Sequence, residues 1–260
     1  QVKSAILFAG LYAEGVTRVE EHQPSRDHTE RMLGLSSTSS NGRNIVAVEG
    51  GRRVEASQFF IPGDPSSAAF FIVAGLIVPN SEILIRNVGL NPTRTGFLET
   101  LQAMGGNIRT ENKRFIGGEP IGDILVTSSA LHSDIVLKGP VIPNIIDEIP
   151  ILAVAAAFAS GRFEVRDAFE LRNKECDRIG AVCENLLLMG IDVEEFDDGF
   201  AFESNNNLIP SHFDSFGDHR IAMAFGVAVI GLSGESTLRE SECVDISFPT
   251  FWDVLHTLAN

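Results

Sequence analysis

A unit of helix, strand, helix and strand, about 60 to 80 residues long, recurs four times along this chain of 260 residues. We expect the first helix of each copy within 1–12, 66–80, 148–161 and 218–234, and the second within 26–35, 91–106, 172–190 and 247–260. Strands are expected at 16–21, 44–48, 53–59, 81–89, 107–111, 162–169, 191–203 and 235–241. A unit of this size is too large for an ordinary solenoid repeat, so the pattern predicts an α/β domain with internal pseudo-symmetry.

The two helices of each unit differ in polarity. The first helix has an uncharged run of ten residues or more, which is typical of a helix buried on all sides. The second helix is amphipathic and is expected to be half exposed. The strand pairs between units would then form sheets packed over central helices.

Composition limits the classes of partner. The hydrophobic content is 44%, which supports a substantial core, while a net charge of -15 argues against a nucleic-acid partner. The longest apolar runs, 151–160 and 221–232, are too short to span a bilayer, and no signal peptide is visible. The three cysteines form no CxxC pair, which indicates reduced thiols and a cytoplasmic location.

Motifs for a metal or a cofactor are missing from the sequence. It contains no HExxH motif or other helical pair of histidines, no phosphate-binding GxxxxGK[ST] or GxGxxG loop, and no GxSxG elbow. The remaining candidates are arginine, lysine, histidine and carboxylate side chains. Such a set suits acid/base chemistry on a small substrate that carries phosphate or carboxylate groups.

The densest group of charges lies in LRNKECDRIG, residues 171–180. If Asn173 caps a helix, Lys174 and Arg178 lie one turn apart on one face, and Glu175 lies three residues before Arg178. Two cations and a carboxylate would then meet at a helix N-terminus, which favours anions. Taken alone, however, such a cluster is more often a solvated helix end with surface ion pairs.

Two further charged groups precede first helices. Asp147-Glu148 either complements the helix dipole or places a carboxylate near a hydroxyl that must lose a proton. Asp218-His219-Arg220 precedes an apolar helix, where a histidine–arginine pair is hard to bury without an anion or carboxylate partner. The alternative is an aspartate cap with both cations in water, and we favour the site interpretation.

Arginines also occur at the starts of second helices. Arg26 and Arg94 are weak candidates individually, since each could be a surface residue bonded to a nearby carboxylate. Charged groups nevertheless recur at helix entrances and are densest in the third and fourth copies. This is the usual location of a site built on a rigid scaffold.

A series of motifs resembles the 3-phosphoshikimate 1-carboxyvinyltransferase (EPSP synthase) family. The motifs are IPGDPSSAAFF (61–71), LNPTRTG (90–96), IDEIPILAVAAAFA (146–159), KECDRI (174–179) and GDHRIAMA (217–224), and QVKSAILFAGL (1–11) and SRDHTERML (25–33) continue the match. The resemblance covers essentially the whole chain. The related UDP-N-acetylglucosamine enolpyruvyl transferases share the repeated fold but do not resemble the KECDR and DHRIAM stretches.

The resemblance implies an EPSP synthase-like, inverse α/β fold. This family fold has two domains of three repeats each, with the chain crossing between them twice. Residues 1–60 would then form one repeat of the second domain, which binds shikimate 3-phosphate. Residues 61–260 would form a nearly complete first domain that carries the residues on the phosphoenolpyruvate side.

The resemblance also implies a reaction. The enolpyruvyl group of phosphoenolpyruvate would be transferred to the 5-hydroxyl of shikimate 3-phosphate with release of phosphate, in aromatic amino-acid biosynthesis, without a metal or an organic cofactor. By motif position, Gln1 and Arg26 would contact shikimate 3-phosphate, and Asp147 and Lys174 would lie near its reacting hydroxyl. Glu175 would donate and accept the proton at the phosphoenolpyruvate methylene. Arg178 and Arg220 would hold the carboxylate and phosphate of phosphoenolpyruvate, with His219 close by. Asp147, Lys174 and Glu175 are the expected catalytic residues.

Two departures from the family pattern limit this assignment. Ile246 precedes Ser247-Phe248-Pro249, where some members have a lysine. The PGSKS-type and NSGTTxR-type substrate contacts of the family's N-terminal portion are not found, and the sequence opens at Gln1 within an apparent helix. We therefore expect a piece of a longer enzyme, with residues 1–60 exposing apolar surface where nothing covers them.

These departures define the expectations for activity. The intact protein is expected to be a monomeric cytoplasmic enzyme, and the 260 residues alone are expected not to catalyse. The alternatives are a UDP-N-acetylglucosamine enolpyruvyl transferase and a non-catalytic scaffold or partial binding half. Neither a membrane nor a nucleic acid is an expected partner.

Overall fold

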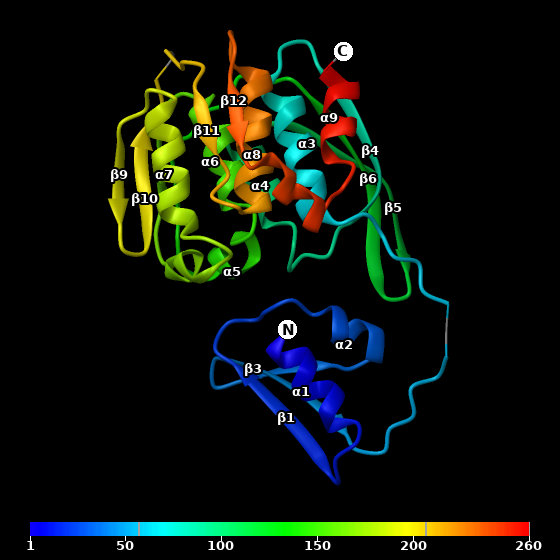
Figure 1. Cartoon of the computed structure of the whole chain (residues 1–260). Helices are drawn as coiled ribbons and strands as arrows, with labels where there is room; N and C mark the ends of the chain where they lie inside the picture. The colour runs from blue at the N-terminus through cyan, green and yellow to red at the C-terminus, as the bar shows by residue number, and fades with distance from the viewer. Residues whose placement is uncertain (57, 206, 260) are drawn as a thin grey trace.

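The computed structural model describes residues 1–56, 58–205 and 207–259 and divides into a smaller and a larger lobe (Figure 1). The smaller lobe is residues 1–49, and the larger lobe begins at residue 61. Each lobe has its own cluster of buried apolar side chains. Ser57, in a predicted strand, and Asn260, in a predicted helix, lie outside the described residues.

The smaller lobe is a three-stranded antiparallel sheet with two helices. Its elements are α1 (Val2–Gly10), β1 (Val16–Glu21), α2 (His28–Leu33), β2 (Ser37–Ser40) and β3 (Arg43–Glu49). The strand order is β1-β3-β2. Leu7 of α1 packs on Val46 and Val48 of β3, which gives this lobe a small core.

Helix α1 differs from the expectation that the first helix of every copy is buried on all sides. Val2 is 76% exposed, and Ile6 and Phe8 are about two-fifths exposed, because only one face of α1 meets the sheet. The charged Lys3 is buried on that face and pairs with Glu30 at 2.6 Å. The smaller lobe therefore exposes apolar surface, as expected.

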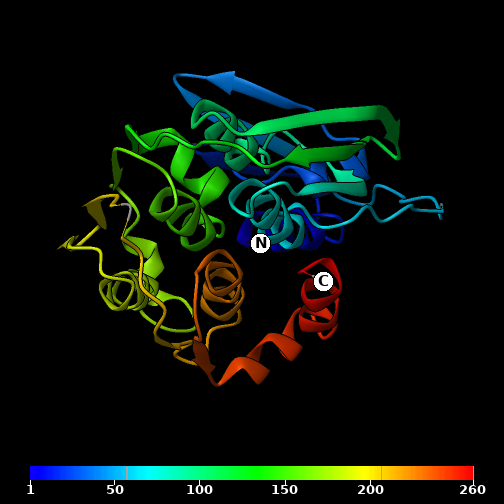
Figure 2. The ribbon, with the colours of Figure 1, turned by 90° about the horizontal axis from the view of Figure 1, so that it is seen from above.

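The larger lobe holds the remaining elements. They are α3 (Pro65–Ile77), β4 (Glu82–Gly89), α4 (Gly96–Ala103), β5 (Asn107–Ile116), β6 (Glu119–Thr127), β7 (Ile135–Leu137), η1 (Gly139–Val141), α5 (Ile142–Ile145), α6 (Ile149–Ala157), β8 (Arg162–Val165), η2 (Phe169–Asn173), α7 (Arg178–Leu188), β9 (Val193–Phe196), β10 (Gly199–Glu203), β11 (His212–Asp214), α8 (His219–Gly231), β12 (Thr237–Arg239), η3 (Ser241–Ile246) and α9 (Phe251–Ala259). The strands form sheets with the orders β4-β6-β5, β7-β8-β10-β9 and β11-β12. These sheets lie around helices α3, α6 and α8 (Figure 2).

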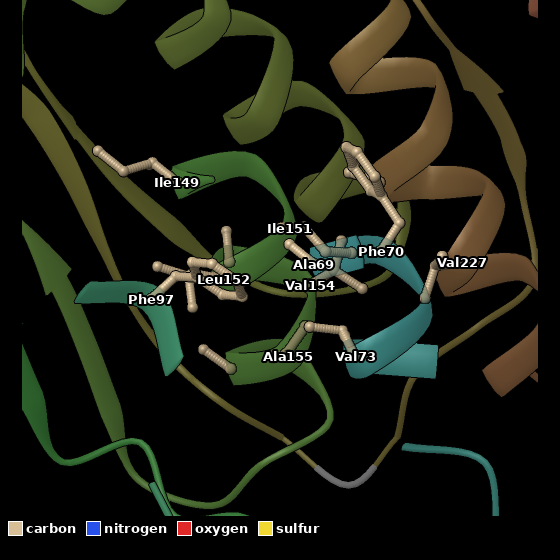
Figure 3. Packing of buried hydrophobic residues seen from close by; sticks show 14 of the residues in the cluster. Ala69, Phe70, Val73, Phe97, Ile149, Ile151, Leu152, Val154, Ala155 and Val227 are labelled. Atoms are coloured by element: carbon tan, nitrogen blue, oxygen red, sulfur yellow. The ribbon is translucent and has the colours of Figure 1, made fainter. Parts of the chain in front are cut away.

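Helices α3, α6 and α8 form the centre of the core. Every residue of α6 is buried, and Val73, Leu152 and Val227 illustrate how the three helices contribute to one packed cluster (Figure 3). This arrangement confirms the prediction that the uncharged runs of the second, third and fourth copies are buried helices. It also confirms the predicted inverse α/β fold class, since the sheets surround the helices instead of lying between them.

The three central helices run in the same direction. At their C-terminal ends, a Cβ added to Gly231 of α8 would lie 2.7 Å from Phe158, just after α6, and 3.1 Å from Ile77 of α3. At their N-terminal ends, Ser66 of α3 donates a hydrogen bond to Glu148, the N-cap of α6. The helix N-termini therefore meet on one side of the larger lobe.

Two predictions about secondary structure were wrong. The described part of 53–59 forms no strand, and Val54 and Phe59 are exposed there, because no neighbouring strand offers a partner edge. The helix expected within 172–190 with Asn173 as its cap begins only at Arg178, where Asp177 accepts the amide of Gly180. Residues Phe169–Asn173 form a separate 3-10 turn instead.

No single helix in the described ranges is long and apolar enough to cross a membrane. The segments Gly139–Ile145 and Ile149–Ala157 pass by length and composition only as a pair, which is bent by 102°. In this structure α6, the second of them, is buried in the core.

Candidate active site

Asp147 lies at the centre of a group of four cationic side chains. Its carboxylate is 2.6 Å from Arg26 Nη2, 3.5 Å from Arg178 Nη1, 3.8 Å from Arg220 Nη2 and 3.9 Å from Lys174 Nζ. We call these five residues the Asp147 cluster. Arg26 comes from the smaller lobe, so the cluster joins the two lobes.

The environment of Asp147 lowers the pKa of its carboxyl group. Burial alone would raise the pKa of the carboxyl group, but Arg220, Arg26 and Lys174 outweigh burial and hold the pKa at about 2. Asp147 is therefore ionised at neutral pH. Its negative charge faces four positive charges, and carboxylates outside the cluster also pair with Lys174 and Arg178. The guanidinium and ammonium groups gathered here are the donors that suit an anionic ligand.

Arg178 is held rigidly in this cluster. Its side chain is 1% exposed, and its Nε donates to Asp218 Oδ2 at 2.7 Å while its Nη2 donates to Glu175 Oε2 at 2.6 Å. Asp218 also caps α8 by accepting the backbone amides of Arg220 and Ile221. Among the described residues, Arg178 Nη1 has no hydrogen-bond acceptor, which leaves one buried donor directed at the cluster.

Lys174 and Glu175 reach the cluster from a turn. Lys174 has an extended backbone between η2 and α7, and its Nζ donates to Glu170 at 3.1 Å as well as approaching Asp147. Glu175 is half exposed beside Arg178. The two residues therefore lie together at the site, although the helical geometry predicted for them is wrong.

Two other residues predicted for the site, His219 and Gln1, are not members of the Asp147 cluster. His219 is the first residue of α8 and is adjacent to Arg220; burial and the Arg220 charge lower its pKa, while Asp218 opposes that shift. Gln1 is exposed, and within the described ranges its only hydrogen bond is the one its carbonyl oxygen accepts from Ala5. The structure thus joins Gln1 to no member of the cluster.

A second network lies beside the cluster; the sequence named its members Arg94 and Glu148 as separate candidates but did not join them. Arg94 Nη2 donates to Asp64 at 2.8 Å and to Ser66 Oγ at 2.7 Å, and Ser66 Oγ in turn donates to Glu148. Glu148 is 1% exposed and lies 3.9 Å from Arg220. The only signal in the sequence was the recurrence of charged groups at helix entrances, since Ser66 and Glu148 are 82 positions apart.

The site is therefore a group of cationic side chains gathered around carboxylates. Within 1–56, 58–205 and 207–259, no cluster of three or more His, Cys, Asp and Glu side chains is placed to hold a metal ion. The N-termini of α6 and α8 add the positive ends of their helix dipoles to the positive side chains. Such a site can bind phosphate and carboxylate groups and move protons between a carboxylate and a bound substrate.

Comparison with known families gives a direct match. The family model for EPSP synthase (3-phosphoshikimate 1-carboxyvinyltransferase) matches residues 1–255. The chain belongs to the EPSP synthase family. This confirms the resemblance drawn from the IPGDPSSAAFF, KECDRI and GDHRIAMA motifs.

Named relatives agree with the family assignment. The chain is 52% identical over 256 residues to 3-phosphoshikimate 1-carboxyvinyltransferase of Salinibacter ruber, covering 98% of this chain and 59% of the relative. It is 50% identical over 260 residues to the protein of the same name from Geobacter metallireducens, covering 100% of this chain and 60% of the relative. The chain thus spans about three-fifths of the length of these EPSP synthases.

Solved structures show the same fold. The EPSP synthase from Acinetobacter baumannii superposes with a TM-score of 0.89 at 40% identity, covering 99% of this chain and 60% of that one. The enolpyruvyl transferase NikO from Streptomyces tendae has a TM-score of 0.72 at 18% identity over 97% of this chain and 57% of its own, which shows a shared fold only.

Proposed function

We propose that the protein transfers the enolpyruvyl group of phosphoenolpyruvate to the 5-hydroxyl of shikimate 3-phosphate and releases phosphate, a step of aromatic amino-acid biosynthesis. The observation that carries this proposal is the meeting of four cations around Asp147 in a chain of the EPSP synthase family. Both substrates carry phosphate or carboxylate groups. Fixed cations would hold the two anions together against their mutual repulsion.

Each member of the site has a role in this proposal. Arg26 and Gln1 bind shikimate 3-phosphate from the smaller lobe. Arg178 and Arg220 bind the carboxylate and phosphate of phosphoenolpyruvate, with His219 beside them. The buried Nη1 of Arg178 supports this role: among the described residues it has no hydrogen-bond acceptor, although Asp147 lies 3.5 Å away, and a bound anion would supply one.

Asp147 and Lys174 act at the hydroxyl group. With a pKa of about 2, Asp147 is a weak base in the ligand-free chain. Two anionic substrates would neutralise the surrounding cations, which raises the pKa of Asp147 and makes it a better proton acceptor. Lys174, 3.9 Å from that carboxylate, would stabilise the charge that develops on the hydroxyl oxygen.

Glu175 transfers a proton to and from the methylene carbon of phosphoenolpyruvate. In the first step the hydroxyl oxygen bonds to C2 of phosphoenolpyruvate, its proton passes to Asp147, and Glu175 gives a proton to the methylene carbon. In the second step Glu175 takes a proton back from the new methyl group, the double bond re-forms, and the bond from C2 to the phosphate oxygen breaks. The departing phosphate takes the proton held by Asp147, which returns both carboxyl groups to their starting states. Glu175 is half exposed and 2.6 Å from Arg178, so it lies at the edge of the anion site, open to a substrate.

We further propose how the chain relates to the whole enzyme. Residues 1–60 are one repeat of the second, shikimate 3-phosphate-binding domain, and residues 61–260 are nearly all of the first domain. The separate cores of the two lobes support this division. The 260 residues alone lack catalytic activity, and the complete enzyme is a cytoplasmic monomer.

Reconstitution tests the proposed function. The chain is fused to the part of the Salinibacter ruber relative that it does not match, and phosphate release from phosphoenolpyruvate is measured with shikimate 3-phosphate. We expect turnover by the fusion and none by the chain alone, with Asp147→Asn inactive and the exposed Asp245→Asn active as the matched control. A folded fusion without turnover, or one that uses a UDP-sugar instead, would contradict the proposal.

A further inference from the structure

The network beside the Asp147 cluster links the N-terminal ends of the three central helices. Asp64 and Ser66 belong to the start of α3, Glu148 is the N-cap of α6, and Arg220 is the second residue of α8. Arg94, from the loop before α4, holds both residues of α3. One continuous polar chain therefore leads from Arg94 through Ser66 and Glu148 to Arg220.

We propose that Glu148, held by Ser66 and Arg94, is a positioning residue that fixes the Arg220 guanidinium beside Asp147 for contact with the anionic substrate. This inference rests on the proposed function, since it assigns the purpose of Arg220 from it. Arg220 Nη1 lies 3.9 Å from Glu148 Oε1 and donates to the Asp147 carbonyl oxygen at 3.3 Å. Glu148 and the Asp147 carbonyl are thus two anchors for one guanidinium.

The burial of Glu148 indicates that its carboxyl group has a purpose other than stability. A carboxyl group that is 1% exposed costs folding free energy, and an apolar side chain of similar size would be buried at lower cost. Among the described residues, Glu148 Oε2 has no hydrogen-bond partner, whereas Oε1 accepts from Ser66. The carboxyl group therefore accepts a hydrogen bond from Ser66 of α3 and places the same oxygen 3.9 Å from Arg220 of α8.

The surroundings of Glu148 act on the pKa of its carboxyl group in both directions. Burial raises this pKa, and Asp147 adds to that rise, while Ser66, Arg220 and Arg94 oppose it. The positioning rests on geometry: Oε1 accepts the Ser66 hydroxyl and is the Glu148 oxygen that lies 3.9 Å from Arg220 Nη1.

Kinetics of the reconstituted enzyme test the inference. Glu148→Ala removes the oxygen that lies 3.9 Å from Arg220 Nη1 and should raise the KM for phosphoenolpyruvate about tenfold, the factor that corresponds to about 1.4 kcal/mol. Glu148→Gln keeps an oxygen at that place and should bring the KM back to that of the parent enzyme. The KM for shikimate 3-phosphate should stay unchanged, and Glu194→Ala, at an exposed residue paired with Arg162, is the matched control.

A second measurement separates this inference from the proposed function. Arginine side-chain NMR of the 260-residue chain reports whether the Arg220 guanidinium is immobile, with the signal assigned by Arg220→Lys. We expect an immobile Arg220 in the parent and in Glu148→Gln, and a mobile one in Glu148→Ala and in Ser66→Ala.

The outcomes are distinct. An enzyme without turnover in which Glu148→Ala still mobilises Arg220 would overturn the proposed function and leave the positioning intact. An immobile Arg220 in Glu148→Ala, or an unchanged KM for phosphoenolpyruvate in an active enzyme, would overturn the positioning. Should Glu148→Ala fail to fold, Ser66→Ala decides, since an immobile Arg220 in that variant contradicts the linkage through Ser66.

Discussion

Asp147→Asn gives a quantitative test of the electrostatics of the site. The pKa of the carboxyl group falls from an ordinary 3.8 to about 2 in the folded chain, which corresponds to about 2.5 kcal/mol of stability at neutral pH. This contribution is fully present above pH 3.8 and is lost as the pH falls through about 2. Asparagine imitates the neutral acid, so Asp147→Asn should lose the full amount at pH 7 and about half of it at pH 3.

Urea unfolding at pH 7 and at pH 3, followed by circular dichroism, measures this loss. For an m-value of about 2.5 kcal/mol/M, the urea midpoint at pH 7 should fall by about 1 M. Asp245→Asn makes the same chemical change at an exposed residue and should leave the midpoint unchanged at both pH values. If Asp147→Asn is as stable as the parent at pH 7, or loses equally at both pH values, the four cations do not stabilise the carboxylate as argued.

Three further variants and reagents probe other parts of the chain. Arg26→Ala removes the 2.6 Å contact between the lobes and should increase hydrogen exchange of the α2 amides, while those of α6 stay protected. Gly199→Ala would place a Cβ 1.9 Å from a backbone carbonyl oxygen and should cost more than about 2 kcal/mol in urea unfolding, whereas Gly180→Ala, with its nearest contact at 3.5 Å, should cost far less. Burial raises the pKa values of Cys176 and Cys183 to about 12. Both thiols should therefore resist iodoacetamide at pH 8 in the folded chain and react after unfolding. Rapid labelling of the folded chain would contradict their burial.

The central helices could be predicted because their signal is local. An uncharged run of ten residues or more has no polar face to turn toward water, so α3, α6 and α8 must be buried wherever the chain places them. The same logic located Arg220, since a charge at the entrance of such a helix must meet a partner. α1 broke the pattern because too little of the smaller lobe packs around it to cover Val2 and Ile6.

The start of α7 could not be predicted from local sequence. Asn173 and Asp177 are both good N-cap residues, four positions apart. Tertiary contacts decide between them, since Arg172 donates to Glu195 and to the Phe196 carbonyl oxygen of β9, in addition to its pair with Asp177. These bonds fix 169–173 as a separate turn against that strand.

The long-range pairs in the site could not be predicted from the sequence either. Arg26 and Asp147 are 121 residues apart and come from different lobes. Glu148 and Ser66 come from different copies of the repeat, and nothing near either residue indicates the other. The packing of the three helices determines which charged residues meet at their N-terminal ends. No local sequence pattern indicates how the three helices pack.

The common direction of α3, α6 and α8 divides the effects of mutation between the two ends of the bundle. At the far end, the side chains of Phe158 and Ile77 lie next to Gly231, so changes there alter stability and expression while leaving ligand affinity per folded molecule intact. At the near end, each helix contributes its first polar groups to one charged assembly, so small changes there alter affinity and turnover more than stability. In a library of variants scored separately for abundance and for turnover, the effect of a substitution should depend on how far it lies from the N-terminal ends of these three helices. Its position in the sequence should matter less.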